Sequence, residues 1–299
     1  MDVTADYVAL RREVGATEVP RDAVRVAGPD TISYLQGQLS QDILPLAVGG
    51  SAWSLLLQPQ GKLDAWVRVS RLADDEVVLD IDGGWGEAVV ARLNRFKLRT
   101  KCEIEQLGGW RCIAVRGPGT PAVAVNNSGA LVVADAGWPH LPGIDLLGPD
   151  VALPVGVRAC GREAYESVRI ECGVPAMGSE LDTSTIPAEA GIVERSVSFT
   201  KGCYTGQELV ARIDSRGSNV PRHLRGVVIG TNVLPPAGAT VHLADGTEVG
   251  RLTSVGESLD LRAPVALASV KRVVTPPADV IVRWEETQVP AQVRSLPLL

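Results

Sequence analysis

Apolar and polar positions in the first part of the chain alternate between strand-like and helix-like spacing. Short strands are predicted at 24–27, 53–57, 63–72, 77–81, 100–106 and 111–115. Pro59–Gly61 is a turn signal, so the strands on either side of it should form a hairpin. Asp30 is expected to cap a helix in which apolar residues recur at helical spacing from Ile32, and a second helix is predicted over 85–97. This mixture is typical of an α+β unit.

A second segment of similar composition follows, from residue 130 to about 225. Strands are predicted near 131–134 and 144–147, and a helix over about 163–172. Gly173 is placed to end that helix in the left-handed conformation. Two strand–helix–strand segments of similar size suggest a duplicated α+β core.

From Leu224 onward the pattern changes to short apolar strands separated by turn signals. These strands are predicted at 226–229, 240–243, 249–255, 265–270 and 280–284. Asp245 and Gly246, between two of them, indicate a hairpin. Evenly spaced short strands favour a small β-barrel or sandwich, with a domain boundary near residue 225.

Composition narrows the class of protein. The chain has 299 residues, of which 45% are hydrophobic and 21% charged, as in globular proteins. The formal net charge of −6 is the wrong sign for a broad nucleic-acid surface, so direct nucleic-acid binding is not expected. No run of 18 apolar residues occurs, and the first residues contain no apolar signal core. We therefore expect no membrane span and a cytoplasmic location.

The cysteines and histidines show no metal-binding pattern. The five cysteines stand far apart without CxxC spacing, and the three histidines are scattered. We expect reduced thiols and no metal site. The residues are Cys102, Cys112, Cys160, Cys172, Cys203, His140, His223 and His242.

The most informative stretch is KGCYTGQE, residues 201–208. Thr205 and Glu208 form a capping-box pattern, which predicts a helix start with Cys203 just outside it. The unpaired N–H groups and the dipole there favour a thiolate, and Lys201 adds positive charge. Cys203 and Lys201 are therefore candidate catalytic residues. The alternative is an ordinary helix start that happens to contain a cysteine.

The same eight residues resemble the signature of the YgfZ family of folate-binding proteins, relatives of the glycine-cleavage T-protein and of a mitochondrial iron–sulfur assembly factor. They are Lys201, Gly202, Cys203, Tyr204, Thr205, Gly206, Gln207 and Glu208. Weaker similarities lie in the family's order at 28–30, 34–42, 58–62, 169–175, 186–191 and 216–219.

This resemblance implies an α+β fold of the T-protein folate-binding type. Residues 1–225 would hold two duplicated ferredoxin-like α/β units, approximately 20–115 and 130–225, and residues 226–299 a small C-terminal β-barrel. The resemblance also implies tetrahydrofolate as the cofactor, bound in a central cavity between these parts. Cys203 would then lie on a loop near the mouth of that cavity.

Three residues are candidates for folate binding. Glu171 is in the last turn of its predicted helix, where the dipole disfavours a negative charge, so its carboxylate needs a partner. That partner is either a surface cation or, as the resemblance implies, the pterin ring, held by a two-point charge-assisted contact. Tyr165 matches an aromatic position implied to contact folate, with a core aromatic as the alternative. Arg225 belongs to a basic run that is either a solvated edge or faces folate's glutamate tail.

One position departs from the T-protein pattern. The aspartate pair that T-proteins carry after the hairpin glycine, which includes their catalytic residue, falls here on Ala65 and Trp66. Asp64 is adjacent but is expected to point to the other face of its strand. The departure argues against aminomethyl transfer.

The function we expect is therefore that of a folate-binding accessory protein without conventional turnover. It would serve the assembly or repair of iron–sulfur clusters, including those of tRNA-modifying enzymes. Its expected partners are folate and iron–sulfur proteins or their assembly machinery, with no nucleic acid and no membrane. The alternatives are a tetrahydrofolate-dependent aminomethyltransferase and a module that acts through protein contacts alone.

Overall fold

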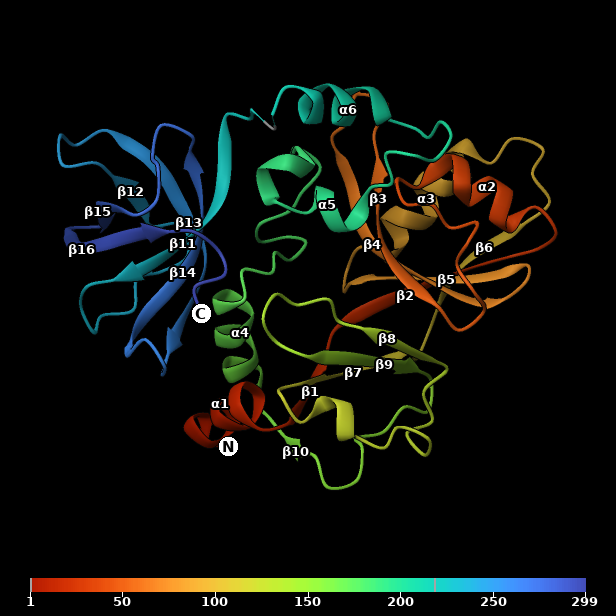
Figure 1. Ribbon diagram of the computed structural model, residues 1–299, viewed down its shortest axis with the longest axis horizontal. Coiled ribbons are helices and arrows are strands. Elements are labelled where there is room, and N and C mark those ends of the chain that lie inside the picture. The colour runs from red at the N-terminus through yellow and green to blue at the C-terminus, as the bar shows by residue number, and fades with distance from the viewer. Residues whose placement is uncertain (1, 218) are drawn as a thin grey trace.

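The protein consists of two five-stranded sheets and a closed barrel (Figure 1). A computed structural model describes residues 2–217 and 219–299, so Ser218 of the 216–219 similarity lies outside the described residues. The α-helices are α1 (Val3–Arg12), α2 (Thr31–Gln38), α3 (Gly86–Phe96), α4 (Arg162–Glu171), α5 (Val193–Ser196) and α6 (Gln207–Ser215). Short 3₁₀ turns occupy Thr120–Ala122 and Pro187–Ala190. Among these described residues, no helix is long and apolar enough to cross a membrane.

The first sheet is antiparallel and has α2 and α3 packed against it. Its hairpin is confirmed, with Gly61 of the turn at φ +80°. Asp30 precedes α2, but its carboxylate accepts a hydrogen bond from the Lys101 N–H at 2.8 Å instead of capping the helix. In spatial order the strands are β3 (Ser51–Leu57), β4 (Leu63–Ala73), β5 (Glu76–Asp82), β2 (Arg21–Ala27) and β6 (Glu103–Leu107).

The strand order of the second sheet is β10 (Arg158–Ala159), β1 (Gly15–Val19), β7 (Arg111–Arg116), β9 (Gly143–Gly148) and β8 (Val132–Asp135). This sheet combines β1, which precedes the first expected unit, with β7 from the end of that unit and β8, β9 and β10 from the second. The expected division at 20–115 and 130–225 therefore differs from the observed one, because β7 pairs with β1 and β9. Helices α1 and α4 pack together beside this sheet, and Gly173 ends α4 at φ +70°, as predicted.

The barrel closes through six antiparallel strands. It begins at Arg222, slightly before the expected boundary, and the Asp245–Gly246 hairpin is confirmed. Sequence analysis missed β16, which pairs with β15 on one side and with β11 on the other and so closes the barrel. In spatial order the strands are β11 (Arg222–Ile229), β14 (Ala263–Lys271), β13 (Glu248–Ser258), β12 (Thr240–His242), β15 (Ala278–Trp284) and β16 (Thr287–Arg294).

Candidate functional site

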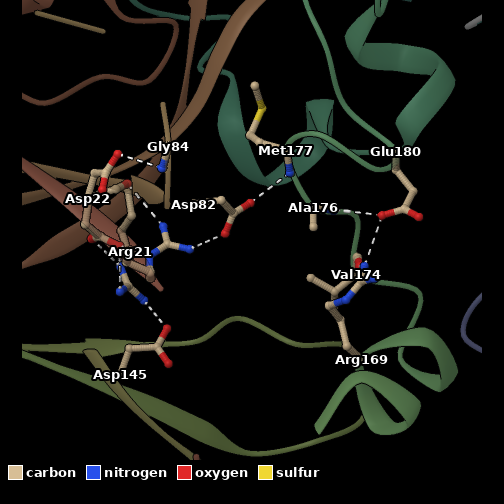
Figure 2. A network of polar contacts seen from close by, with 12 residues as sticks. Arg21, Asp22, Asp82, Gly84, Asp145, Arg169, Val174, Ala176, Met177 and Glu180 are labelled. Carbon is tan, nitrogen blue, oxygen red and sulfur yellow. Dashed lines mark hydrogen bonds and ion pairs between the residues drawn. The ribbon is translucent and has the colours of Figure 1, made fainter. Parts of the chain in front are cut away.

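The two open sheets face each other across a layer of charged and aromatic side chains. On the first sheet, Arg68 pairs directly with Asp80, and paired residues of antiparallel strands point to the same side. Asp145 approaches from β9 of the second sheet. The layer encloses a cavity of about 40 Å³, hereafter the inner chamber (Figure 2). It is lined by Val19, Arg21, Trp53, Trp66, Asp82, Arg116, Trp138, Asp145, Tyr165, Arg169, Val174, Pro175 and Ala176.

The charges of this layer are paired with one another. Arg68 donates to both carboxylate oxygens of Asp80, at 3.0 and 3.1 Å, and to Asp145 at 2.7 Å. Arg116 Nη2 lies 2.8 Å from the other oxygen of Asp145. Burial alone would raise the pKa of Asp145, but Arg116, Arg68 and Arg21 together lower it well below its usual range. The aspartate therefore stays ionised and fixes the two sheets relative to each other.

Aromatic rings complete the walls of the inner chamber. Trp53 stacks on Trp66 with ring centroids 4.3 Å apart, and the guanidinium of Arg116 lies 4.3 Å from the Trp138 ring centroid. Burial raises the pKa of Tyr165 to about 12, so its hydroxyl stays neutral. Trp53 Nε1 and Arg116 Nε are buried without a hydrogen-bond partner among the described residues. These donors suit a few ordered waters, because the chamber is far below the roughly 300–1,000 Å³ of ligand pockets.

The segment after α4 covers the inner chamber and is held at two points (Figure 2). Asp82 accepts the Met177 N–H at 2.8 Å and also accepts Arg21 Nη1 at 2.9 Å. Arg169 Nη1 donates to the Val174 carbonyl at 2.6 Å and to the buried Glu180 carboxylate at 3.1 Å. Asp82 and Asp145, the two carboxylates that line the chamber, are thus both held by arginines.

A much larger cavity, of about 840 Å³, lies beside the inner chamber and shares Trp138 with it as a wall. This outer cleft lies between the β8–β9 connection, the end of α4, the barrel and the last residues of the sequence. It is lined by Gly137, Trp138, Pro139, Cys172, Gly173, Ala190, Gly191, Glu194, Arg195, Leu224, Arg225, Ser295, Leu296 and Pro297.

Two arginines give the outer cleft its electrostatic character. Burial lowers the pKa of Arg195 to about 10 and also lowers the pKa of Arg225. Arg195 donates to the Gly137 carbonyl at 3.1 Å and lies over Trp66, whereas Arg225 donates to the Leu224 carbonyl at 3.2 Å. Within the described ranges, neither arginine forms an ion pair with a carboxylate. The cleft also contains Glu194, so its partly buried cations outnumber its carboxylate by two to one. This arrangement suits an anionic ligand.

The signature loop, residues 201–208, is attached to the end of α2. The Lys201 ammonium donates to the carbonyls of Gln36, Leu39 and Gln41 at 2.8, 2.7 and 2.9 Å. These bonds use all three of its N–H groups. Burial lowers the pKa of Lys201 to about 8, although nearby Asp42 opposes the effect. Lys201 thus anchors the loop at the negative end of a helix dipole.

The predicted capping box is wrong. Helix α6 begins at Gln207 with Gly206 as its N-cap at φ +81°, and Thr205 instead donates its backbone N–H to the Gly37 carbonyl at 3.1 Å. A Cβ at Gly206 would lie 2.4 Å from the Gln58 carbonyl oxygen, so only glycine permits this contact with the β3–β4 hairpin. Gln207, rather than Glu208, reaches back with its side chain and accepts the Tyr204 N–H at 3.2 Å.

Cys203 is exposed and lines neither the inner chamber nor the outer cleft. The other four cysteines are buried, and burial raises the pKa of each thiol, to about 11 for Cys160 and about 12 for Cys172. The signature therefore presents the one exposed thiol in the part of the chain that the structure describes, on a loop held in place by Lys201 and Gly206.

The folate-binding candidates separate in the structure. Tyr165 lines the inner chamber and Arg225 the outer cleft, but Glu171 lines neither. Its buried carboxylate accepts the Tyr7 hydroxyl at 2.5 Å and lies 3.7 Å from Arg11. The placement of Glu171 in a ligand cavity is therefore corrected. In a helix, residues two apart lie about 200° around the axis, so Arg169 faces the chamber and Glu171 faces α1.

The structure shows where Asp64, next to the missing aspartate pair at Ala65 and Trp66, is directed. Leu56 pairs with Ala65 and Leu57 with Leu63, so Asp64 is the extra residue of a β-bulge. Its carboxylate is turned to Arg92, whose Nε donates at 2.7 Å. Trp66 lies at the chamber wall instead.

Comparisons with known proteins agree with this architecture. Residues 222–299 match the family described as the glycine cleavage T-protein C-terminal barrel domain. The solved glycine cleavage system aminomethyltransferase T of Bartonella henselae covers 99% of this chain and 89% of its own, with a TM-score of 0.82 at 22% identity. The chain has the fold of the glycine-cleavage T-proteins. An uncharacterized protein of Haemophilus influenzae is 28% identical over 66% of this chain and 67% of its own length. An aminomethyltransferase of Bordetella petrii is 26% identical over 98% of this chain and 87% of its own.

Sequence reasoning missed several residues that line these T-protein-fold cavities. Arg169 stands two residues before Glu171 in the same similarity, and the helical period could have separated the two. Trp138 and Arg195 carried no recognisable motif, because they reach the cavities from loops or from the very short helix α5.

Proposed function

We propose that this chain binds tetrahydrofolate in the outer cleft and serves as an accessory protein for iron–sulfur clusters. The observation that carries the folate assignment is a cleft of about 840 Å³ with two partly buried arginines that have no carboxylate partner among the described residues. The pteridine ring and benzoyl group of folate are flat and its glutamate carries two carboxylates. Trp138 would face the rings, and Arg195 and Arg225 the carboxylates.

The accessory role rests on two further features. The signature loop resembles that of the YgfZ family, and it presents Cys203 to solvent. The aspartate pair expected to supply the carboxylate that orients a reacting amine falls here on Ala65 and Trp66, and the carboxylates that line the inner chamber are paired with arginines. When bound, the folate would supply one-carbon chemistry, whereas the residues of this chain bind it and exclude water from one side.

Aminomethyl transfer is the second candidate, because relatives that are 24–26% identical carry the name aminomethyltransferase. Loss of the orienting carboxylate is expected to slow such a reaction by about 10²–10⁴-fold. Release of ammonia from aminomethylated carrier protein at a rate typical of T-proteins would favour this candidate over the accessory role.

Calorimetric titration tests the binding site. Arg225→Gln should weaken folate binding by about 1.5–3 kcal/mol, the value of a charge-assisted hydrogen bond, which is roughly 10–150-fold in Kd. 6-Methyltetrahydropterin lacks the benzoylglutamate and carries no carboxylate, so the substitution should leave its Kd nearly unchanged. Arg251→Gln, on the same barrel but in an exposed pair with Glu248, is the matched control. Equal losses for folate and 6-methyltetrahydropterin would remove Arg225 from the tail site, and absence of folate binding by the wild type would refute the assignment.

The iron–sulfur role needs a cellular measurement. In cells that lack this chain, tRNA modifications made by iron–sulfur enzymes should fall and should return with the wild-type chain. Restoration by a Cys203→Ala variant, at equal abundance, would show that the thiol is not needed for this role.

A further inference from the structure

The last residues of the sequence form part of the outer cleft. Ser295, Leu296 and Pro297 line it together with Trp138 and Arg195. These residues follow β16, whose final residue Arg294 pairs with Gly226 on β11. Figure 1 shows the end of the chain beside α4, between the barrel and the second sheet. We call residues 295–299 the tail segment.

Two glycines lie under the leucines of the tail segment. A Cβ at Gly173 would lie 2.8 Å from the Cβ of Leu296, and a Cβ at Gly226 would lie 2.4 Å from Cδ2 of Leu298. Gly173 needs a left-handed φ in any case, but Gly226 has no positive φ. At Gly226 the docked leucine side chains fill the space that a Cβ would take, so a side chain there would displace Leu298 from its docked position.

The tail segment is also held by its backbone and by an apolar surface. The Leu298 N–H donates to the Glu171 carbonyl at 2.7 Å, which satisfies one of the free carbonyls at the end of α4. Beneath the leucines lie buried Ile170 of α4 and Val265 and Leu267 of β14. The tail thus joins α4 to the barrel across the edge of the cleft.

We propose that Leu296 and Leu298 are positioning residues of the outer cleft: their docking over Gly173 and Gly226 builds one wall of the ligand site and covers Cys172. Cys172 lines the cleft and is only 1% exposed, directly beside Gly173. Ligand binding and tail docking then reinforce each other, because a ligand in the cleft contacts the docked tail and not the released one.

Thiol labelling tests the docking without any ligand. In a Cys203→Ser background, Leu296→Ser/Leu298→Ser should speed the alkylation of Cys172 about tenfold or more, while Cys160, Cys102 and Cys112 keep their slow rates. Val233→Ser/Leu234→Ser, an exposed apolar pair elsewhere on the barrel, is the matched control and should change none of the four rates. Equal acceleration of all four cysteines would indicate general destabilisation and would overturn the proposal, as would an unchanged rate at Cys172. The milder Leu298→Ala reports on the same point if the double variant does not fold.

The affinity measurement rests on the proposed folate site. There the tail variant should bind folate about 5–150-fold more weakly, the usual range of coupling between two sites, and folate should slow the labelling of Cys172 in the wild type. If the wild type binds folate and the variant binds it equally well, the positioning role fails while the proposed function stands. If the wild type does not bind folate, the proposed function fails, and the labelling result alone decides whether the leucines form the wall.

Discussion

The inner chamber and the outer cleft share Trp138, but their arginines differ in whether they are paired with carboxylates. In the inner chamber Arg68 and Arg116 meet Asp145 at 2.7–2.8 Å, and the space left is about 40 Å³. In the outer cleft Arg195 and Arg225 have no ion-pair partner among the described residues, and the space is about 840 Å³. Removing one partner of a buried ion pair leaves an uncompensated charge and destabilises the fold, whereas incompletely paired charges in an open cavity are available to a ligand.

The largest effect is expected from breaking the inner network. Asp145→Asn leaves two buried arginines without their shared counter-charge, so the free energy of unfolding should fall by about 3–5 kcal/mol. Urea denaturation at neutral pH measures it. Glu18→Gln, which removes an exposed pair with Arg111, is the control and should cost less than about 1 kcal/mol.

The pH dependence of stability tests the same network of Asp145 and its arginines. The arginines lower the pKa of Asp145, so the stability it contributes is present above its ordinary pKa of about 3.9 and is lost as pH falls toward the lowered value. The difference in stability between wild type and Asp145→Asn should therefore shrink below pH 4. If Asp145→Asn lowers the free energy of unfolding no more than Glu18→Gln does, the inner charges do not stabilise the sheets.

Substitution of an arginine in the outer cleft should affect ligand binding and leave stability nearly unchanged, the reverse of Asp145→Asn. Arg195→Gln removes a cation whose burial is unfavourable, so unfolding should be little changed, but folate affinity should fall by about 1.5–3 kcal/mol. Calorimetry and urea denaturation on the same sample measure both quantities. If the variant loses stability but keeps its folate affinity, Arg195 stabilises the fold, as Arg68 does, and does not bind the ligand. The two cavities would then not differ in how their arginines are used.

Glu171 should show a smaller effect, because it belongs to neither cavity. Burial raises the pKa of Glu171, with Tyr7 and Arg11 opposing the shift. The stability from its protonated form is therefore present below its ordinary pKa of about 4.3 and is lost as pH rises through the raised value. A tenfold change in proton affinity corresponds to about 1.4 kcal/mol.

Substitution isolates this contribution. Between pH 4 and pH 7, Glu171→Gln should lose less stability than the wild type, and Tyr7→Phe should lose more, because the hydroxyl that supports the carboxylate is gone. Parallel pH profiles for all three proteins would contradict the raised pKa. Folate affinity should be the same in all three.

Local patterns predicted the elements better than they predicted which side chains meet. Short apolar runs located β3, β4 and β5 and most of the barrel, and in these three strands burial is nearly continuous rather than alternating. The bulge at Asp64 follows from strand pairing made across the sequence, which local spacing does not contain, whereas the opposite directions of Arg169 and Glu171 follow from the helical period alone. Gly206 shows the same limit: Thr205 and Glu208 had the capping pattern, but contact with Gln58 selected another cap.

Cys203 should give the smallest change in stability. Its side chain is exposed, so Cys203→Ala should alter the free energy of unfolding by no more than about 0.5 kcal/mol, the range of surface substitutions. Reactivity should nevertheless differ sharply among the thiols, because alkylation requires both access and thiolate, and burial denies both to the other four. Brief treatment with iodoacetamide followed by mass spectrometry should label Cys203 first, and denaturation should equalise the five sites.

Lys201→Met sharpens the comparison, since it releases the loop from α2 without touching the thiol. If that variant labels Cys203 at the wild-type rate but loses function in cells, the loop's fixed position matters more than its chemistry. If native labelling begins at any buried cysteine instead, Cys203 is protected by contacts that its exposure does not reveal, and its assignment as the reactive thiol fails.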